Sequence, residues 1–239
     1  HRLPVSPTER LTFGSAVDAG VEAVIVQQRA YGAVTDMRIA YSAAAQVILR
    51  DDTAVVFGDV ETAILAFVDD VIPKYDWVLC STQHAIAIEV PGWGPVSGHP
   101  DIILHDGTVL DVKTAAKQKN ADAVAMSVEL GFYALAREVE TGLLVARVGY
   151  LVWVRVKKPY WQQLVVPVTE RMLAHARVTA DGYTRARKAD AALNAKAETP
   201  INWAFNGGPK FPGLCGDCEY APGNGGPCEM AVEDSDGEV

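Results

Sequence analysis

The sequence predicts a single α/β domain followed by a small cysteine-rich appendage and an acidic tail. Segments with helical spacing of apolar residues come first, and short β-branched segments bounded by Gly or Pro follow them. After Pro200 the composition shifts to Gly, Pro, Asn and Cys. This order favours one mixed domain over residues 1–199. A cysteine-rich segment is expected over 200–228, and a disordered tail over 229–239.

Three helices are expected at the beginning of the chain. In the first, apolar residues recur at helical spacing at Val17, Val21, Val24 and Ile25. The expected helices cover 14–31, 36–49 and 59–71. Ser15 is a plausible N-cap for the first, and Asp59 for the third.

The remaining elements of the main domain are mostly strands. Four strands of a largely antiparallel meander are expected at 77–81, 84–90, 99–106 and 108–114. A helix near 121–138 comes next, and 143–157 forms one long strand or a pair of strands. A further strand at 162–168 precedes a long polar helix at 168–195.

Charge and hydropathy exclude some classes of protein and leave others open. Of 239 residues, 49% are hydrophobic, which argues against disorder. Without a run of about 18 uncharged apolar residues, a membrane partner is not expected. The net charge of −9 includes five acids and no base in 229–239, so −4 remains for the rest. A nucleic-acid partner is therefore not excluded. The first 30 residues show no signal-peptide pattern, and we expect a cytoplasmic protein.

A hairpin in the strand region brings acidic residues together. Asp106-Gly107 lies between two apolar segments, which is a strong hairpin signal. A two-residue loop would place Asp101 opposite Val112. A three-residue loop at 105–107, with Gly107 in the left-handed region, places Asp101 opposite Asp111.

The three-residue loop would gather a carboxylate pair and a lysine on one face of the sheet. Asp111 and Lys113 share a face because strand side chains alternate. Opposed carboxylates such as Asp101 and Asp111 repel each other, and a divalent cation removes that cost. Mg²⁺ and Mn²⁺ favour carboxylate oxygens. A lysine beside the ion can stabilise charge on a phosphoryl transition state.

These motifs resemble the PD-(D/E)XK nuclease superfamily, and more narrowly its RecB-like exonuclease branch. Pro100-Asp101 with Asp111-x-Lys113-Thr114 fits the signature. Gly14-x-x-x-Asp18 resembles the branch's first motif, with Asp in place of His. Gly98-x-x-Asp101 matches unchanged. Glu129-x-x-x-Tyr133 resembles the last motif, with Glu in place of Gln. The resemblance implies a restriction-endonuclease-like core, in which a mixed central sheet is flanked by helices.

The resemblance also implies roles for these residues. Asp18, Asp101, Asp111 and the Val112 carbonyl would bind Mg²⁺ or Mn²⁺. Lys113 would be the catalytic lysine. Glu129 and Tyr133 would border the active site and the DNA.

The cysteines point to a second site. Cys215-x-x-Cys218 and Cys228 crowd the C-terminal end, a pattern that favours a metal or iron–sulfur site. Similar RecB-like nucleases, including CRISPR-associated and AddB-type ones, carry a [4Fe–4S] cluster. The resemblance implies such a cluster here, with Zn²⁺ as the alternative. The fourth ligand is either Cys80 or a residue upstream of His1, unless the site is of another kind.

DNA is the expected partner, as single strands or duplex ends. Basic residues beside aromatic ones suit frayed ends, and the candidates are Lys117, Lys119, Tyr133, Arg155 and Lys157. We expect a metal-dependent DNA exonuclease in recombination, repair or phage DNA processing, in a bacterial cell or a phage-infected host. A helicase or recombination protein is a further possible partner. An endonuclease on the same fold and an inactive DNA-binding or assembly module are the alternatives.

Overall fold

The computed structural model describes residues 8–90 and 94–194. Their elements, in chain order, are α1 (Glu9–Tyr31), α2 (Met37–Asp51), α3 (Phe57–Asp70), η1 (Ile72–Lys74), β1 (Ser81–Thr82), β2 (Ile86–Val90), β3 (Gly94–Gly98), β4 (Ile102–Ile103), β5 (Val109–Ala115), α4 (Ala121–Ala125), α5 (Val128–Thr141), β6 (Arg147–Val154), β7 (Tyr160–Pro167) and α6 (Glu170–Asn194). The sheets and α1–α5 belong to one compact unit that ends at Arg177, inside α6.

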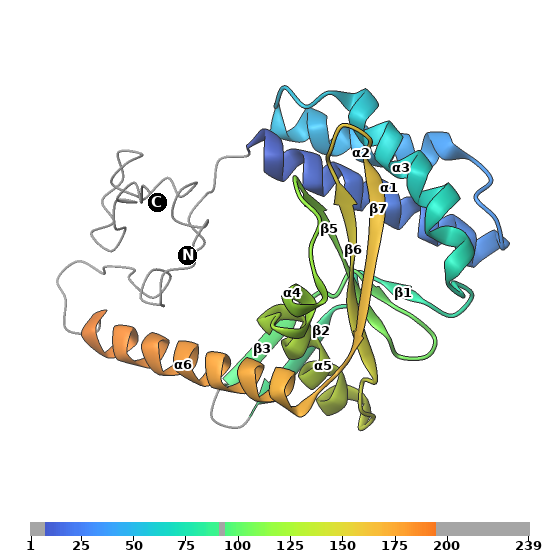
Figure 1. Cartoon of the computed structure of the whole chain (residues 1–239). Helices are drawn as coiled ribbons and strands as arrows, with labels where there is room; N and C mark the ends of the chain where they lie inside the picture. The colour runs from blue at the N-terminus through green and yellow to red at the C-terminus, as the bar shows by residue number, and fades with distance from the viewer. Residues whose placement is uncertain (1–7, 91–93, 195–239) are drawn as a thin grey trace, which may run out of the picture. The chain divides into compact units, whose positions relative to one another are not determined.

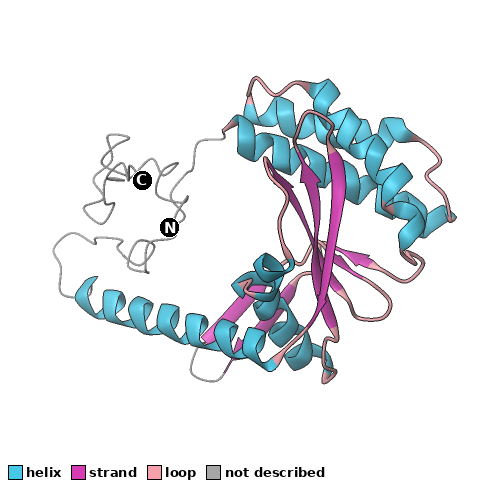
Figure 2. Ribbon diagram, viewed as in Figure 1, coloured by secondary structure: helices cyan, strands magenta, loops and turns pink. Residues whose placement is uncertain are grey.

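The main sheet is mixed, as predicted. Its five strands lie in the order β1-β4-β5-β6-β7 (Figure 1). β5 and β6 are parallel, and the other neighbouring pairs are antiparallel. The chain passes from β5 to β6 through α4 and α5, because parallel neighbours need a crossover connection. Figure 2 shows the strands in magenta between two groups of helices.

Helices cover both faces of the sheet, and each face has its own core. On one face, buried residues of α1 and α3 pack against Leu110, Val112, Leu151 and Trp153. On the other face, α5 and the beginning of α6 pack against Val109, Val148, Val152 and Val154. Strands buried on both faces need apolar residues at nearly every position. Polar residues inside β5 are therefore exceptions that need a reason, and these exceptions are Asp111, Lys113 and Thr114.

The first helix begins earlier than the sequence predicts. α1 begins at Glu9, and the side chain of Thr8 caps it by accepting a hydrogen bond from the Leu11 N–H at 3.3 Å. The prediction of Ser15 as N-cap is therefore wrong. Thr12 and Phe13 are buried, so the buried face extends a further turn toward the N-terminus.

The predicted cap of the third helix is also wrong. α3 follows Val56, which makes no side-chain cap hydrogen bond, and Asp59 lies inside the first turn. Its negative charge suits the positive end of the helix dipole there.

The predicted strand at 77–81 is mostly a turn. Asp76 Oδ1 accepts a hydrogen bond from the Val78 N–H at 3.0 Å, which starts the turn. The Trp77 indole N–H donates to the Ile72 carbonyl at 2.8 Å. The Cys80 N–H donates to the Trp77 carbonyl at 3.3 Å, so the backbone groups of this segment bond within the turn, and only the two residues of β1 join the sheet.

The predicted four-strand meander is wrong as well. β2 pairs with β3 in a separate two-stranded sheet and not with the hairpin that follows it. The predicted strand at 99–106 shrinks to β4. Pro100 lacks an N–H for a ladder, and the Asp101 carbonyl accepts from the Gln83 N–H at 3.0 Å.

The predicted helix at 121–138 is two helices. The Ser127 hydroxyl accepts from the Leu130 N–H at 3.1 Å and so starts α5 after a break at Met126–Ser127. The region 143–157 holds one strand, β6. The other expected elements are present as β7 and α6. The predicted boundary at residue 199 and the appendage and tail lie outside the described residues, so those parts stay predictions.

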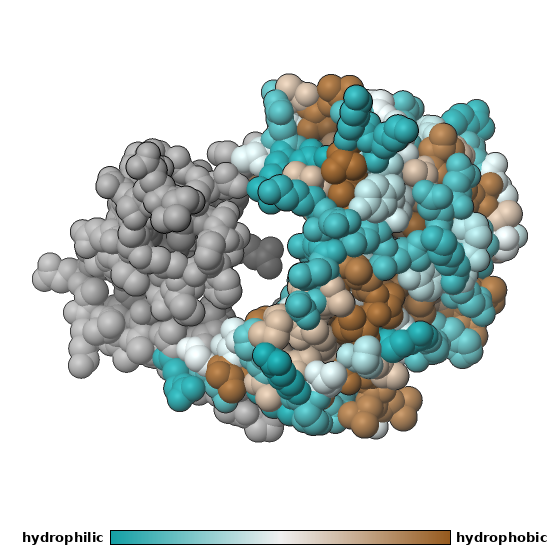
Figure 3. Space-filling model, viewed as in Figure 1, coloured by the Kyte–Doolittle hydropathy of each residue, from teal (hydrophilic) through white to brown (hydrophobic). Residues whose placement is uncertain are grey.

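On the face shown in Figure 3, hydrophilic side chains cover much of the described surface, with hydrophobic residues in smaller groups between them. No helix in the described ranges is long and apolar enough to cross a membrane.

Candidate active site

The hairpin between β4 and β5 has the three-residue loop that opposes the two aspartates. Leu104 and Thr108 close the loop with a hydrogen bond from the Leu104 N–H to the Thr108 carbonyl at 2.9 Å. Gly107 has a φ of +80°, in the left-handed region. Ile102 pairs with Leu110 and Ile103 with Val109, and the same register extended by one position places Asp101 across from Asp111. The structure therefore has the register of the three-residue loop, one of the two predicted alternatives.

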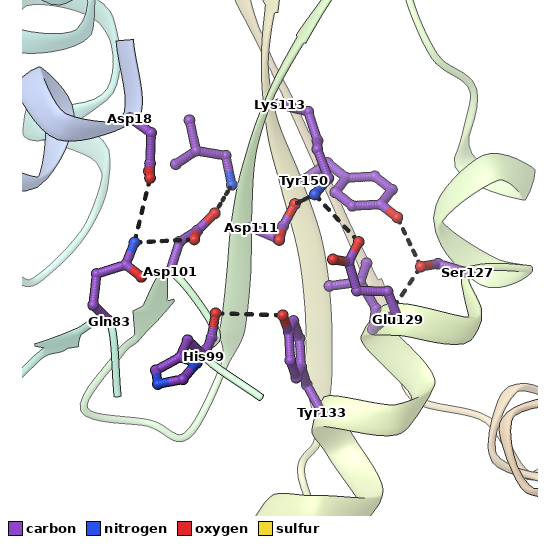
Figure 4. A network of polar contacts seen from close by, with 12 residues as sticks. Asp18, Gln83, His99, Asp101, Asp111, Lys113, Ser127, Glu129, Tyr133 and Tyr150 are labelled. Atoms are coloured by element: carbon purple, nitrogen blue, oxygen red, sulfur yellow. Dashed lines mark hydrogen bonds and ion pairs between the residues drawn. The ribbon is translucent and has the colours of Figure 1, made fainter. Parts of the chain in front are cut away.

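Gln83 joins two carboxylates of the site. Its Nε2 donates to Asp101 Oδ1 at 3.1 Å and lies 3.4 Å from Asp18 Oδ2 (Figure 4). The other oxygen of Asp101, Oδ2, accepts from the Val112 N–H at 2.7 Å. Asp18 comes from α1, so this amide ties the first helix to the hairpin.

Gln83 was not among the predicted site residues. Its φ of +46° is uncommon for a residue with a side chain. No spacing or turn signal in the sequence points to such a conformation, because it depends on the contacts of Gln83 with Asp101.

Lys113 lies between two acids. Its Nζ is 2.7 Å from Asp111 Oδ2 and 3.2 Å from Glu129 Oε2. Asp111 Oδ2 is buried and has no hydrogen-bond donor in the described part of the chain beyond this ion pair. The side chain of Asp111 is 3% exposed, whereas that of Glu129 is 44% exposed. The lysine therefore links a buried carboxylate on β5 to a carboxylate at the start of α5.

α5 also contacts the segment before Asp101. The Tyr133 hydroxyl donates to the His99 carbonyl at 3.3 Å. A Cβ placed on Gly98 would meet Cε1 of Tyr133 at 2.9 Å, closer than real Cβ atoms approach. Gly98 therefore leaves room for the tyrosine ring, which explains the glycine of Gly98-x-x-Asp101 in physical terms.

Tyr150 and Ser127 fix the start of α5 relative to the sheet. The Tyr150 hydroxyl donates to Ser127 Oγ at 2.7 Å, and the same oxygen caps α5. Tyr150 is the partner of Asp111 in the parallel β5–β6 register. This contact holds Glu129 near Lys113, because Glu129 lies two positions after Ser127.

Burial and mutual repulsion change the acidity of the three aspartates. Burial, with the charge of Asp101 second, raises the pKa of Asp111 to about 8, although Lys113 opposes the shift. Burial and the charges of Asp101 and Glu22 raise the pKa of Asp18 to about 7. Burial also raises the pKa of Asp101, against the Val112 N–H, Lys113 and Gln83. The cluster therefore holds more negative charge than its surroundings stabilise.

Lys113 and Tyr133 keep their protons. Burial alone would lower the pKa of Lys113, but the charges of Asp111 and Glu129 outweigh it and raise that pKa. Burial and the charge of Glu129 raise the pKa of Tyr133. Lys113 is therefore a cation at neutral pH, which fits electrostatic stabilisation and not proton abstraction.

The donor set suits a hard divalent cation, although it is not pre-assembled as a metal cage. Within 8–90 and 94–194, no three His, Cys, Asp or Glu side chains are grouped closely enough to hold a metal. The Gln83 amide lies between Asp18 and Asp101, and Lys113 lies on Asp111. Carboxylate oxygens such as these, buried and with raised pKa values, are nevertheless the kind of ligand that Mg²⁺ and Mn²⁺ prefer.

Comparison with protein families decides the assignment. A model described as the PD-(D/E)XK nuclease superfamily matches residues 2–222. The chain belongs to the PD-(D/E)XK nuclease superfamily. Members of this superfamily typically use divalent metals such as Mg²⁺, and a nuclease fold implies a nucleic-acid substrate.

Two solved structures are similar to this chain. A crystal structure from Eubacterium rectale, of a protein provisionally described as an exonuclease, has a TM-score of 0.54 and 14% sequence identity. The similarity covers 88% of this chain and 79% of that one. A second structure, of SSO0001, has a TM-score of 0.32 and 12% identity, and it covers 84% of this chain and 90% of that one. No curated protein matches the sequence.

The predicted DNA-binding residues of this nuclease divide between the two faces of the sheet. Lys119 lies over the Tyr150 ring, with Nζ 5.6 Å from the ring centroid. Arg155 lies over the Phe13 ring at 4.8 Å, on the α1 side. Lys117 and Lys157 are exposed. The structure therefore brings Lys119 and Tyr133 to the α5 side and separates Arg155 from them.

The cysteines of the predicted cluster are only partly visible. Cys215, Cys218 and Cys228 lie outside the described residues. Cys80 is a free, buried cysteine, and burial raises the pKa of its thiol. Its carbonyl accepts from Arg29 at 3.2 Å. Both the iron–sulfur and the zinc alternatives stay predictions, as does the role of Cys80.

Proposed function

We propose that this superfamily member is a metal-dependent DNA exonuclease of the RecB-like branch. The observation that carries the proposal is the convergence of Asp101, Asp111 and Lys113 on one face of the sheet. Lys113 is paired to Asp111 at 2.7 Å, and Asp18 is joined to Asp101 through Gln83. These components suit phosphodiester hydrolysis, since the carboxylates can bind a divalent cation and the lysine supplies a fixed positive charge.

The roles of the residues follow from their charges. Asp101 and Asp111, with Asp18 and the Val112 carbonyl, would hold Mg²⁺ or Mn²⁺. The bound ion would activate water and stabilise the phosphate oxygens. Lys113 stays protonated and stabilises the negative charge that develops on the phosphate as water attacks and the P–O bond breaks. Glu129 orients Lys113 through their ion pair, and Tyr133 donates a hydrogen bond at the border of the site.

The proposal extends to the setting of the reaction. The RecB-like motifs support a nuclease of DNA recombination, repair or phage DNA processing, acting on single strands or duplex ends. Lys117, Arg155 and Lys157 are proposed outer contacts with DNA. The C-terminal cysteines would hold a [4Fe–4S] cluster as a structural staple. Protein purified without oxygen should then be brown and contain iron and sulfide, whereas a colourless protein with bound zinc would contradict this part.

The test of exonuclease function compares linear and circular single-stranded DNA of the same sequence. With Mg²⁺ or Mn²⁺, the protein should release nucleotides from the linear form and leave the circle intact. Asp111→Asn serves as the control for contaminating nucleases and should be inactive on both. Cleavage of the circle by the unmodified protein, but not by Asp111→Asn, would indicate an endonuclease instead. No cleavage of either substrate would contradict the proposed enzyme.

A further inference from the structure

The segment directly after β5 is held in place by side chains from β7. The Lys119 N–H donates to Gln162 Oε1 at 2.9 Å, and Gln162 Nε2 donates to the Lys119 carbonyl at 2.8 Å. The Tyr160 hydroxyl adds a hydrogen bond to Gln118 Oε1 at 3.3 Å. One amide side chain therefore satisfies both backbone groups of Lys119, as a neighbouring strand would.

The sheet register explains why Gln162 reaches this segment. Lys113 pairs with Val152, and Val152 pairs with Gln162, so the three side chains lie in one row on one face. Gln163, the next residue, points to the opposite face, where its Nε2 donates to the Asp70 carbonyl at 3.3 Å. The side chains of these two adjacent glutamines of β7 thus lie on opposite faces of the sheet, and that of Gln162 lies on the same face as Lys113.

The fixed backbone places a cation beside the active site. Lys119 Nζ lies 5.6 Å from the centroid of the Tyr150 ring. Tyr150 is next to Asp111 in the register, and its hydroxyl donates to Ser127 at 2.7 Å. Lys113 is ion-paired with Asp111 and Glu129, whereas Lys119 forms no ion pair with a carboxylate in the described part of the chain. Its positive charge remains for an anionic partner, which a DNA phosphate would supply.

We propose that Lys119 binds a backbone phosphate of the DNA strand beside the cleavage site, and that Gln162 is the positioning residue that holds Lys119 there. This inference rests on the proposed nuclease function. A lysine on a free loop would lose conformational freedom on binding, and the amide of Gln162 removes part of that cost in advance. The Tyr150 ring limits the directions that the ammonium group can take.

The test measures how salt affects DNA affinity. The slope of log K against log[salt] is negative, and each lost phosphate contact makes it shallower by about 0.7 for single strands. All proteins carry Asp111→Asn, so that binding to a fluorescent single-stranded oligonucleotide is measured without hydrolysis. Fluorescence anisotropy is recorded from about 50 to 200 mM KCl. The added changes are Lys119→Met, Lys119→Arg, Gln162→Met and Gln162→Glu. Gln163→Met is the matched control on the opposite face.

Lys119→Met should make this slope shallower by about 0.7. Between 1 M and 0.1 M salt, the variant should therefore gain about fivefold less affinity than the parent protein. Lys119→Arg should restore the slope. Gln162→Met should also make the slope shallower, although Lys119 is intact. The double variant Lys119→Met, Gln162→Met should have the same slope as Lys119→Met alone. Gln162→Glu, which lacks the donor for the Lys119 carbonyl, should act in the same direction, while Gln163→Met should leave the slope unchanged.

Three results would overturn the inference in distinguishable ways. If the Asp111→Asn protein is folded but binds no DNA, the proposed function fails and the inference fails with it. If it binds DNA with a normal salt slope that neither Lys119→Met nor Gln162→Met changes, only the inference fails. Equal effects of Gln162→Met and Gln163→Met would reduce Gln162 to a structural residue of β7 and would also contradict the proposal.

Discussion

Replacing Asp111 with Asn should stabilise the metal-free protein at alkaline pH. The folded pKa of Asp111 is about 8, far above its ordinary value of 3.8, because the group is buried opposite Asp101. A carboxyl with a raised pKa binds its proton more tightly when folded. Its contribution to stability is therefore full below about pH 4 and is lost as pH rises toward 8. Asn has nearly the same shape and cannot ionise, so it avoids this loss.

The magnitude follows from the size of the shift. At pH 8 the difference between the two pKa values corresponds to at most about 6 kcal/mol. One third of this, about 2 kcal/mol, would raise Tm by about 4–8 °C for a domain of this size. Bound Mg²⁺ should act in the opposite sense, because it stabilises the unmodified protein by about 2.7 kcal/mol at 100 times its Kd. This corresponds to about 5–11 °C in Tm.

The assay is thermal unfolding followed by circular dichroism at pH 5 and pH 8, with EDTA or with Mg²⁺. In EDTA, Asp111→Asn should melt above the unmodified protein at pH 8, and the difference should shrink at pH 5. Mg²⁺ should raise Tm of the unmodified protein much more than that of the variant. The control is Asp106→Asn in the same hairpin, where hydrogen bonds to Thr108 and Arg147 lower the pKa of the exposed Asp106 against the effect of burial. Equal melting of the Asp111→Asn and unmodified proteins at pH 8, with equal responses to Mg²⁺, would refute the reasoning.

Three further predictions concern single side chains. Lys113→Met should lower kcat for DNA cleavage by about 10²–10³-fold with a smaller effect on KM, because a charge that stabilises the transition state is lost. Steady-state kinetics would separate the effects on kcat and KM, and an unchanged kcat would exclude this role. Gly20→Ala should destabilise the fold by about 1–3 kcal/mol, because its Cβ would lie 2.2 Å from Ile64 Cδ1. Urea unfolding measures the lost stability, and adding Ile64→Val to the same chain should recover part of it. Ser127→Ala should lower the free energy of unfolding by about 0.5–2 kcal/mol, since it removes the cap of α5 and the hydrogen-bond partner of Tyr150. Adding Tyr150→Phe should then change the urea midpoint little. Additive losses of stability would argue against a shared contact.

Local signals in the sequence were enough to predict the hairpin of the candidate site. Asp106-Gly107 between apolar segments predicted a hairpin with a loop of two or three residues. The structure has the three-residue alternative, with Gly107 in the left-handed region and Asp101 across from Asp111. The alternation of β5 predicted that Asp111 and Lys113 share a face. These features depend only on residues close together in the chain, where turn chemistry and strand periodicity decide the conformation.

Features that depend on distant contacts were not predictable in the same way. Gln83 enters the site because its backbone takes a positive φ and pairs with Asp101, 18 positions away. The separate β2–β3 sheet follows from a competition between pairing partners that periodicity alone does not resolve. The family resemblance predicted a mixed sheet but not the parallel pairing of β5 with β6, because the spacing of apolar residues does not encode strand direction.

The metal dependence of DNA hydrolysis at Asp101 tests the central claim most directly. Release of label from end-labelled linear DNA is measured against Mn²⁺ concentration for the unmodified protein, Asp101→Asn and the control Asp106→Asn. The account predicts saturable, Mn²⁺-dependent release by the unmodified protein and Asp106→Asn, and none by Asp101→Asn. Release by Asp101→Asn at the unmodified rate, or release that persists in EDTA, would contradict it.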